Sequence, residues 1–176
     1  MAFGRRRVLI AGAVGIAAAT TGALVALGLR RSADRSSAAL QAAKFSDLDG
    51  RTRQLGEWKG KIVVCNFWAT WCPPCREEIP MLIDLSKKMG PKGVEVVGIA
   101  VDYEAKVRNF VRDYNVTYPV LVAGPDGLDL MRRAGNEVGG LPFTAFLDRQ
   151  GKIVHEKLGA LSQSEVEGQL GRMLRS

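Results

Sequence analysis

Apolar residues recur along the chain at two spacings, one typical of buried strands and the other of amphipathic helices. Strand-like runs are predicted over residues 61–68, 94–101, 118–123, 143–148 and 152–159. Helical spacing is predicted over residues 77–89, 104–114, 128–133 and 163–174, the last with Ser162 as its N-cap. Strands separated by helices and closed by an antiparallel hairpin predict an α/β sandwich with a mixed sheet.

A short hairpin is expected ahead of this alternation. Residues 45–55 place Asp49-Gly50 between short flanks, which is a sequence signal of a tight turn. Residues 30–43 are small and polar and have the composition of a linker. The folded domain is therefore expected over residues 44–176, with the hairpin as its N-terminal extension.

The first part of the chain is apolar enough to enter a membrane. Residues 8–29 form a run of 22 residues without a charge. As a helix rising ~1.5 Å per residue, such a run would cross a hydrocarbon core of about 30 Å. Residues 1–7 form a basic region in front of it and are expected on the cytoplasmic side.

An uncleaved, single-pass anchor is favoured over a cleaved signal, whose apolar region is usually roughly 7–15 residues long. Cleavage stays open, as does twin-arginine export, which Arg5-Arg6-Arg7 loosely resembles. Each alternative carries the domain across the cytoplasmic membrane to the periplasmic or extracytoplasmic side.

The formal net charge of +7 does not indicate nucleic-acid binding. Five of the 25 basic residues lie before residue 32, where no acidic residue occurs, which leaves 20 basic against 18 acidic residues in the rest. No basic stripe interleaved with aromatic residues remains in the domain, so nucleic acid is not an expected partner.

Two of the three cysteines lie in WATWCPPCREEIP, residues 68–80. A zinc site is not expected, because one C-x-x-C pair, Cys65 and the single His155 do not supply a usual ligand set. Arg76 stands where covalent haem attachment requires histidine. A purely structural disulfide across so short a loop would contribute little, since its stabilisation grows with loop length. No metal or other cofactor is expected, and the pair is interpreted as redox-active.

Each position of the motif fits thiol-disulfide exchange. Cys72 falls at a helix N-terminus, where free backbone N–H groups and the helix dipole stabilise a thiolate, so it is the predicted nucleophile. Pro73 and Pro74 suit a first helical turn, where a missing N–H has no partner to lose. Cys75, three residues on, lies on the same helical face and is positioned to resolve a mixed disulfide at Cys72.

Residues 66–82, NFWATWCPPCREEIPML, resemble the thioredoxin superfamily and, within it, the membrane-anchored TlpA/ResA-like thiol-disulfide oxidoreductases with a redoxin-type domain. The resemblance covers residues 44–174. It implies a thioredoxin-like three-layer sandwich with a mixed central sheet. It also implies that an X-Pro bond ahead of a late strand is cis and lies beside the cysteines, which makes Pro142 the cis candidate. Leu141 would then offer its backbone to an extended substrate, and Trp71 would be a flat apolar contact beside the thiols.

Two acidic positions refine this resemblance. Thioredoxins proper carry a buried aspartate six residues before the first cysteine, where this chain has Asn66, which cannot take up a proton. TlpA/ResA-like proteins place a glutamate three residues after the second cysteine, and this position matches Glu78. Its carboxylate would accept the proton of Cys75 if burial raises its pKa toward neutrality. Glu77 is expected to face solvent.

Three further residues are given structural roles. Cys65 is expected to be a buried thiol in a strand, and Trp68 is expected to support the core. His155 alternates with Val154 in the last hairpin, so a surface or edge position is expected.

We therefore expect a membrane-tethered, monomeric domain that reduces protein disulfides outside the cytoplasm with Cys72 and Cys75. The resemblance implies a membrane thiol-electron donor and, as clients, apocytochrome c, copper-delivery proteins or oxidase subunits. A disulfide-donating oxidase would use the same residues at another reduction potential. A non-catalytic copper chaperone is the third alternative, although such carriers favour C-x-x-x-C with a distal histidine.

Overall fold

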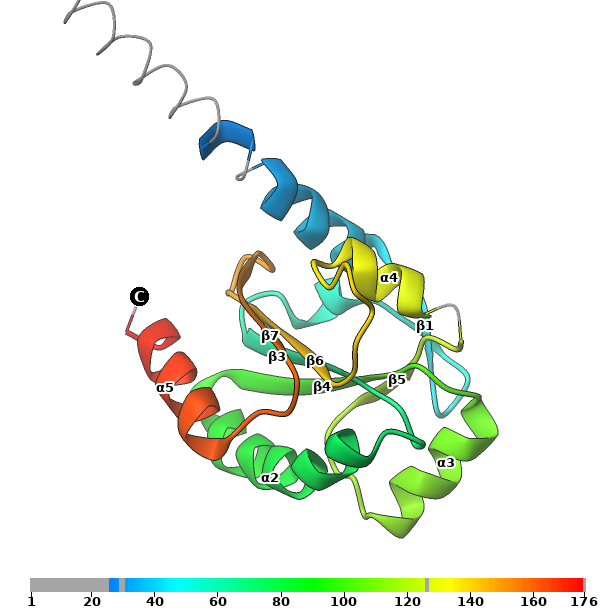
Figure 1. Cartoon of the computed structure of the whole chain (residues 1–176). Helices are drawn as coiled ribbons and strands as arrows, with labels where there is room; N and C mark the ends of the chain where they lie inside the picture. The colour runs from blue at the N-terminus through cyan, green and yellow to red at the C-terminus, as the bar shows by residue number, and fades with distance from the viewer. Residues whose placement is uncertain (1–25, 29–30, 126, 176) are drawn as a thin grey trace, which may run out of the picture. The chain divides into compact units, whose positions relative to one another are not determined.

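The computed structural model describes residues 26–28, 31–125 and 127–175. The chain divides at Asp34, and the unit from Arg35 onward is the folded domain (Figure 1).

The predicted basic region over 1–7 and most of the predicted anchor over 8–29 lie outside the described residues. Within the described part of the chain, no helix combines the length and the apolar character needed to cross a bilayer.

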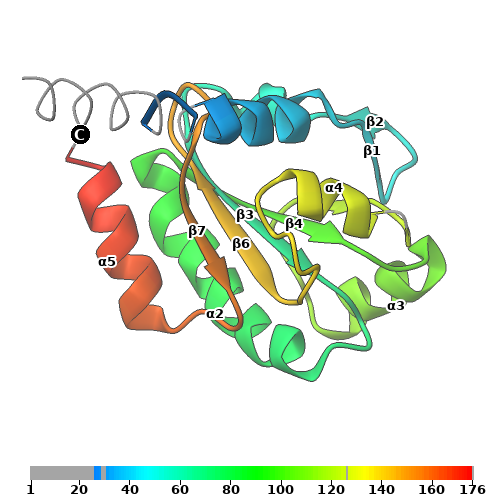
Figure 2. The ribbon, with the colours of Figure 1, turned by 45° about the horizontal axis from the view of Figure 1, so that its top comes forward.

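Seven strands form one mixed sheet in the order β2-β1-β5-β4-β3-β6-β7. The strands are β1 Phe45–Asp47, β2 Thr52–Arg53, β3 Ile62–Trp68, β4 Val94–Ala100, β5 Val120–Val122, β6 Phe143–Leu147 and β7 Ile153–Leu158. β3, β4 and β5 run parallel to one another, whereas the remaining pairs are antiparallel. The mixed sheet predicted from the alternation of strands and helices is confirmed (Figure 2).

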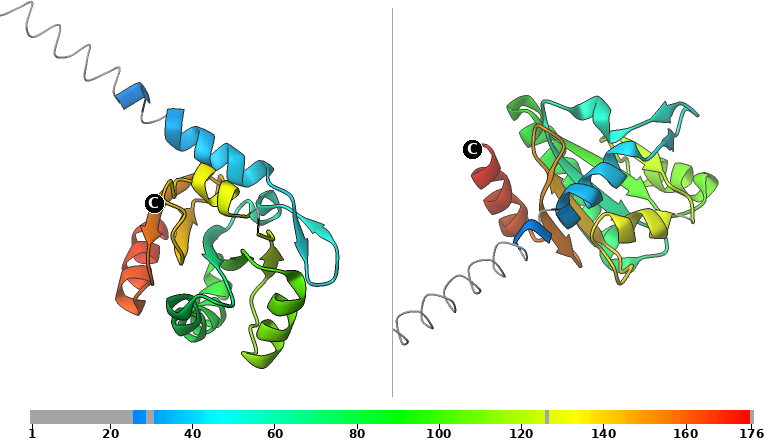
Figure 3. Two further views of the ribbon diagram at one scale, coloured as in Figure 1. Left: turned by 45° about the vertical axis from the view of Figure 1, so that its right-hand side comes forward. Right: turned by 90° about the horizontal axis from the view of Figure 1, so that it is seen from above.

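Helices cover both faces of this sheet and make three layers (Figures 1 and 3). They include α2 Pro73–Met89, α3 Glu104–Asp113, α4 Gly127–Arg133 and α5 Gln163–Met173, and the chain also contains the short 3₁₀ helices η1 Leu55–Trp58 and η2 Gly90–Lys92. The apolar residues of α2, α3 and α5 pack in one core, and those of α4 pack in the other. The thioredoxin-like sandwich is therefore present.

β3 contributes side chains to both cores. All seven of its residues are buried, because the strand is covered on both faces. Val64 and Trp68 pack toward α2, whereas Cys65 and Phe67 pack toward α4. This double burial explains why six of the seven residues of β3 are apolar, Asn66 being the exception.

The N-terminal hairpin forms as predicted. β1 and β2 pair antiparallel, and β1 also pairs with β5, so the hairpin extends the sheet. The Asp47 carboxylate holds the turn, since its Oδ1 accepts hydrogen bonds from the backbone N–H of Asp49 (3.0 Å) and Arg51 (2.8 Å). Gly50 supplies the positive φ of 79° that the turn requires.

The compact unit begins earlier than the expected start at Lys44. Residues 31–42, within the expected linker, are helical, and alanine-rich sequence favours that conformation. Leu40 is fully buried, and Ser37 Oγ accepts a hydrogen bond from the backbone N–H of Ile153 at 3.0 Å. Composition alone suggested a linker because only one large apolar residue anchors this segment.

Candidate active site

The motif cysteines lie between the end of β3 and the start of α2. Cys72 is the N-cap of α2 in an extended conformation (φ −94°, ψ 106°), and Pro73 and Pro74 occupy the first helical turn. The backbone N–H of Cys75 donates to Cys72 Sγ at 3.4 Å. The N-terminus of the helix thus points at the sulfur of Cys72, an arrangement that stabilises a thiolate.

Cys72 and Cys75 are joined by a disulfide, with their Cα atoms 5.3 Å apart. The exposed fraction is 4% for Cys72 and 0% for Cys75, so Cys72 is the more accessible of the two. Trp71, the preceding residue, is 62% exposed, and Pro73 is exposed as well. The solvent-exposed surface next to Cys72 is therefore apolar.

Glu78 lies one helical turn beyond Cys75 and is only 4% exposed. Its Oε1 accepts a hydrogen bond from Asn66 Nδ2 at 2.7 Å, and its Oε2 accepts one from the backbone N–H of Leu161 at 2.8 Å. Burial raises the pKa of the Glu78 carboxyl above its ordinary value, although the two hydrogen bonds oppose this shift. Burial therefore shifts the pKa in the direction that the predicted proton acceptor requires, and the role of Glu78 stays a prediction.

Asn66 has a role that the sequence did not reveal. Its amide donates to Glu78 and also to Thr144 Oγ1 at 3.0 Å, so it bridges α2 and β6. Asn66 and Thr144 are direct neighbours in the β3–β6 register. The sequence alone gave no signal of this contact, because Asn66 does not titrate and no local pattern specifies the β3–β6 register.

The Leu141–Pro142 peptide bond is cis, as the resemblance implied. β6 begins at Phe143, which pairs with Phe67 near the end of β3, so Leu141 and Pro142 lie at the sheet edge from which Cys72 projects. The Pro142 carbonyl accepts a hydrogen bond from the backbone N–H of Gly159 at 2.8 Å. The motif and the cis proline therefore lie at the same end of the sheet, and Glu78 is hydrogen-bonded to Asn66 near that end.

The residues given structural roles lie as predicted. Cys65 and Trp68 are fully buried, and burial raises the pKa of the Cys65 thiol. Glu77 and His155 are exposed. Within the described residues, no group of three or more histidine, cysteine or acidic side chains is arranged to hold a metal ion.

The Redoxin family matches residues 35–170 of the chain. The chain belongs to this family. Thiol-disulfide oxidoreductase ResA of Bacillus cereus is 36% identical over 129 residues, which cover 73% of this chain and 72% of ResA.

Two solved structures share the fold of this redoxin. A thiol:disulfide interchange protein of the thioredoxin family from Chlorobium tepidum TLS is 30% identical with a TM-score of 0.65, covering 75% of this chain and 92% of that chain. An exposed lipoprotein thioredoxin from Streptococcus pneumoniae strain TIGR4 is 28% identical with a TM-score of 0.62, covering 74% of this chain and 98% of that chain. This redoxin is thus a TlpA/ResA-like thiol-disulfide oxidoreductase of the thioredoxin superfamily.

Contacts between distant segments hold the active-site loop of this redoxin in place. Thr70 Oγ1 donates to the carboxylate of Asp102, which follows β4. Arg76 Nη2 donates to the Tyr114 hydroxyl at 2.6 Å, and the Tyr114 ring stacks on Phe110 with centroids 4.0 Å apart. The sequence could not indicate these hydrogen bonds, because the partners lie 32 and 38 residues apart.

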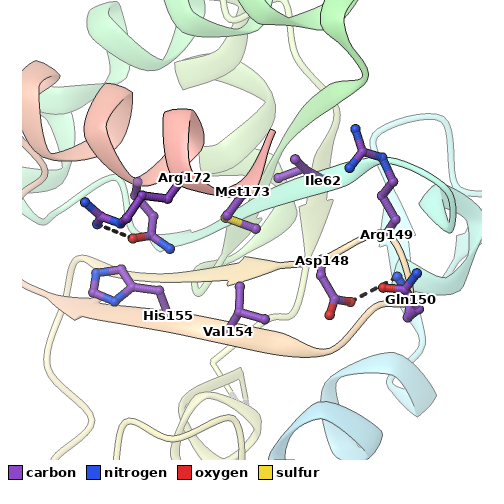
Figure 4. A pocket seen from close by; sticks show the side chains of 9 residues that line it. Ile62, Asp148, Arg149, Gln150, Val154, His155, Arg172 and Met173 are labelled. Carbon is purple, nitrogen blue, oxygen red and sulfur yellow. Dashed lines mark hydrogen bonds between the residues drawn. The ribbon is translucent and has the colours of Figure 1, made fainter. Parts of the chain in front are cut away.

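A cavity of about 800 Å³ opens between the β6–β7 hairpin and α5 (Figure 4). Its lining consists of Ile62, Asp148, Arg149, Gln150, Val154, His155, Gln169, Arg172 and Met173. Ile62 is the first residue of β3, whereas Cys72 follows the last. The cavity is therefore at the opposite end of the sheet from the disulfide and contains none of the predicted site residues.

Proposed function

We propose that this redoxin is a membrane-tethered reductase of protein disulfides that works outside the cytoplasm. The observation that carries the proposal is the Cys72–Cys75 disulfide at the N-terminus of α2, with the buried carboxyl of Glu78 one turn further on. The similarity to ResA supports the exchange chemistry, and the exposed lipoprotein thioredoxin supports a location outside the cytoplasm.

The proposed reaction has two displacement steps. In the reduced protein, the Cys72 thiolate attacks one sulfur of a client disulfide, and the other client sulfur leaves as a thiolate. The Cys75 thiolate then attacks Cys72 Sγ, which closes the Cys72–Cys75 disulfide and releases the second client thiol. Two electrons pass from the cysteine pair to the client.

Glu78 is proposed to accept the proton of Cys75 before the second step. Cys75 is fully buried in the disulfide form, so its sulfur has no direct contact with bulk water. Glu78 lies on the same helical face, and its raised pKa brings the carboxylate closer to the working pH of a general base.

The client segment is proposed to lie across the sheet edge that carries these groups. Trp71 and the Pro73-Pro74 turn would contact it beside Cys72, and the backbone of Leu141, next to Pro142, would pair with it in an extended conformation. The exposure of Trp71 and the position of Leu141 ahead of β6 support this arrangement.

The cycle closes when a membrane thiol-electron donor reduces the Cys72–Cys75 disulfide again. Residues 8–29 are proposed to tether the domain, and apocytochrome c or copper- and oxidase-assembly proteins are the proposed clients. These partners rest on the resemblance to the TlpA/ResA-like group.

A redox titration of the Cys72–Cys75 pair tests the direction of electron flow. If the protein is a reductase, we expect the reduction potential of the Cys72–Cys75 pair to be close to that of thioredoxin, about −270 mV. A potential near about −120 mV, typical of strong oxidants, would overturn the proposal in favour of the disulfide-donating oxidase.

A further inference from the structure

Three polar atoms buried beneath α2 have no hydrogen-bond partner among the described residues. They are Asn66 Oδ1, Trp68 Nε1 and the Tyr118 hydroxyl. Asn66 and Trp68 are fully buried, and Tyr118 is only 3% exposed. Buried polar groups are nearly always hydrogen-bonded, and an internal water molecule is a common partner. Three such atoms in one region therefore indicate a partner that they share.

The sheet register brings these groups together around Gly98. Asn66 of β3 pairs with Gly98 of β4 on one side and with Thr144 of β6 on the other. Asn66 Nδ2 donates to Thr144 and to Glu78, so the NH₂ group is turned toward β6 and α2. This orientation leaves Asn66 Oδ1 on the side of Gly98.

Two aromatic rings approach each other over Gly98. A Cβ built on this glycine would lie 2.9 Å from Trp68 Nε1 and 3.0 Å from Tyr118 Cε2. Both atoms are thus close to one point, so the indole N–H and the Tyr118 ring lie side by side. Both rings belong to the core that α2 covers. The absence of a side chain at Gly98 allows this approach.

Tyr118 lies close enough to Glu78 for the two side chains to interact electrostatically. Burial, and after it the Glu78 charge, raises the pKa of the Tyr118 hydroxyl. The hydrogen bonds that act on Glu78 come from two neutral groups, the Leu161 N–H and the Asn66 amide. Since no direct hydrogen bond to the Tyr118 hydroxyl is present, the two groups are separated by a distance that one bridging water molecule suits.

The four groups match the hydrogen-bonding capacity of a single water molecule. The indole N–H of Trp68 is only a donor, and the hydroxyl of Tyr118 can donate as well. Asn66 Oδ1 and the ionised carboxylate of Glu78 are acceptors. A water oxygen can accept from the two donors while its hydrogens go to the two acceptors.

We propose that Tyr118 is a positioning residue that holds an internal water molecule against the Glu78 carboxylate, together with Asn66 and Trp68. The water donates a hydrogen bond to the carboxylate and so stabilises its charged form, which offsets part of the effect of burial. Glu78 thereby stays able to accept the proton of Cys75. The inference deepens the proposed function, because it rests on Glu78 as the proton acceptor.

A titration of Glu78 in the oxidised full chain, in detergent micelles, tests the positioning role. The carbon-13 shift of each labelled glutamate carboxyl follows its protonation, and the resonance missing in Glu78→Gln identifies Glu78. Tyr118→Phe removes only the hydroxyl and should move the midpoint to higher pH by about one pH unit, a tenfold change in proton affinity. Tyr103→Phe, at a side chain that is 64% exposed, is the matched control and should leave the midpoint unchanged. An unchanged or lower midpoint in Tyr118→Phe would overturn the proposal.

The rate of Cys72–Cys75 closure gives a second readout. Below the midpoint, Tyr118→Phe should slow this step up to about tenfold, whereas the rate at alkaline pH should be unchanged. In a Glu78→Gln background, the same substitution should have no further effect. An equal loss at every pH, or an equal loss in both backgrounds, would mean that Tyr118 is only structural.

A crystal structure of the oxidised full chain tests the water itself. We expect one ordered water within about 3.2 Å of the Tyr118 hydroxyl and of the Glu78 carboxylate, and none at that place in Tyr118→Phe. A wild-type structure without this water, or a water that stays in Tyr118→Phe, would overturn the proposal. Neither the titration nor the crystal structure depends on the direction of electron flow. A reduction potential typical of an oxidase would therefore overturn the proposed function and leave both results unchanged.

Discussion

Two opposing effects act on the carboxyl group of Glu78. Removal from water favours its neutral form, whereas the hydrogen bonds from Leu161 and Asn66 favour the charged form. Burial has the larger effect, so the pKa is raised. Asn66 therefore does not replace the acid of thioredoxins proper, but it holds Glu78, the proposed proton acceptor, through a hydrogen bond.

Glu78→Gln should flatten the pH dependence of the second exchange step near neutrality. The glutamine keeps the shape of the side chain but cannot accept the Cys75 proton, so the rate at pH 7 should fall by about 10²-fold or more. Rapid quenched-flow measurement of Cys72–Cys75 closure from acidic to alkaline pH checks this. Glu77→Gln, an exposed neighbour, is the control, and an unchanged profile in Glu78→Gln would make Glu78 a structural residue only.

The raised pKa of Glu78 also predicts a pH-dependent stability. The folded protein holds the proton more tightly than the unfolded chain, where glutamate titrates near its ordinary value of 4.5. The favourable contribution of the protonated form is complete below that pH and is lost as the pH rises through the folded-state pKa.

Urea unfolding at a series of pH values measures this effect. The free energy of unfolding of the wild type minus that of Glu78→Gln should decrease as the pH rises from 4.5 toward neutrality. The substitution can also remove a hydrogen bond of the Glu78 side chain. A loss of stability that is the same at every pH does not change the slope of this difference against pH. A difference that increases with pH would mean that the hydrogen bonds outweigh burial.

At the scale of elements, the order of strands and helices follows from the spacing of apolar residues, and the contacts between elements do not. β3, β4 and the last hairpin formed within one or two residues of their predicted bounds because burial on one or both faces determines their patterns. Asn66 and Thr144 became partners only through the β3–β6 register, which no local pattern specifies. The helix over 31–42 was missed for a similar reason, since its position depends on the single buried leucine, Leu40.

Leu40→Ala should show how much this helical segment contributes to the domain. Deleting a fully buried leucine side chain leaves a cavity and should lower the free energy of unfolding by about 2–5 kcal/mol. Urea unfolding is the measurement. Ala38→Ser, at an exposed position of the same segment, should stay within about 0.5 kcal/mol of wild type. A similarly small change in Leu40→Ala would contradict the burial of this segment.

At the scale of the whole molecule, the net charge differs between the N-terminal segment before residue 32 and the rest of the chain. The basic excess lies before residue 32, around the uncharged run over 8–29, whereas the domain is close to neutral. This pattern supports the proposed membrane tether over residues 8–29.

Alkaline carbonate extraction of membranes tests the tether. The full chain should stay in the membrane pellet, because a spanning helix resists extraction, and a variant that begins at residue 31 should appear in the supernatant. Full-length chain in the supernatant would contradict an anchor, and a shortened chain there would indicate a cleaved signal instead.

The exchange chemistry assigned to Cys72 and Cys75 is tested most directly by trapping in cells. Cys75→Ser removes the resolving thiol, so we predict a mixed disulfide between Cys72 and a client, visible as a heavier band on non-reducing gels and lost on reduction. Mass spectrometry of that band identifies the client and the linked residue, and Cys72→Ser should give no such band. Full turnover by Cys75→Ser, or a trapped client in the absence of Cys72, would contradict the roles assigned to the two cysteines.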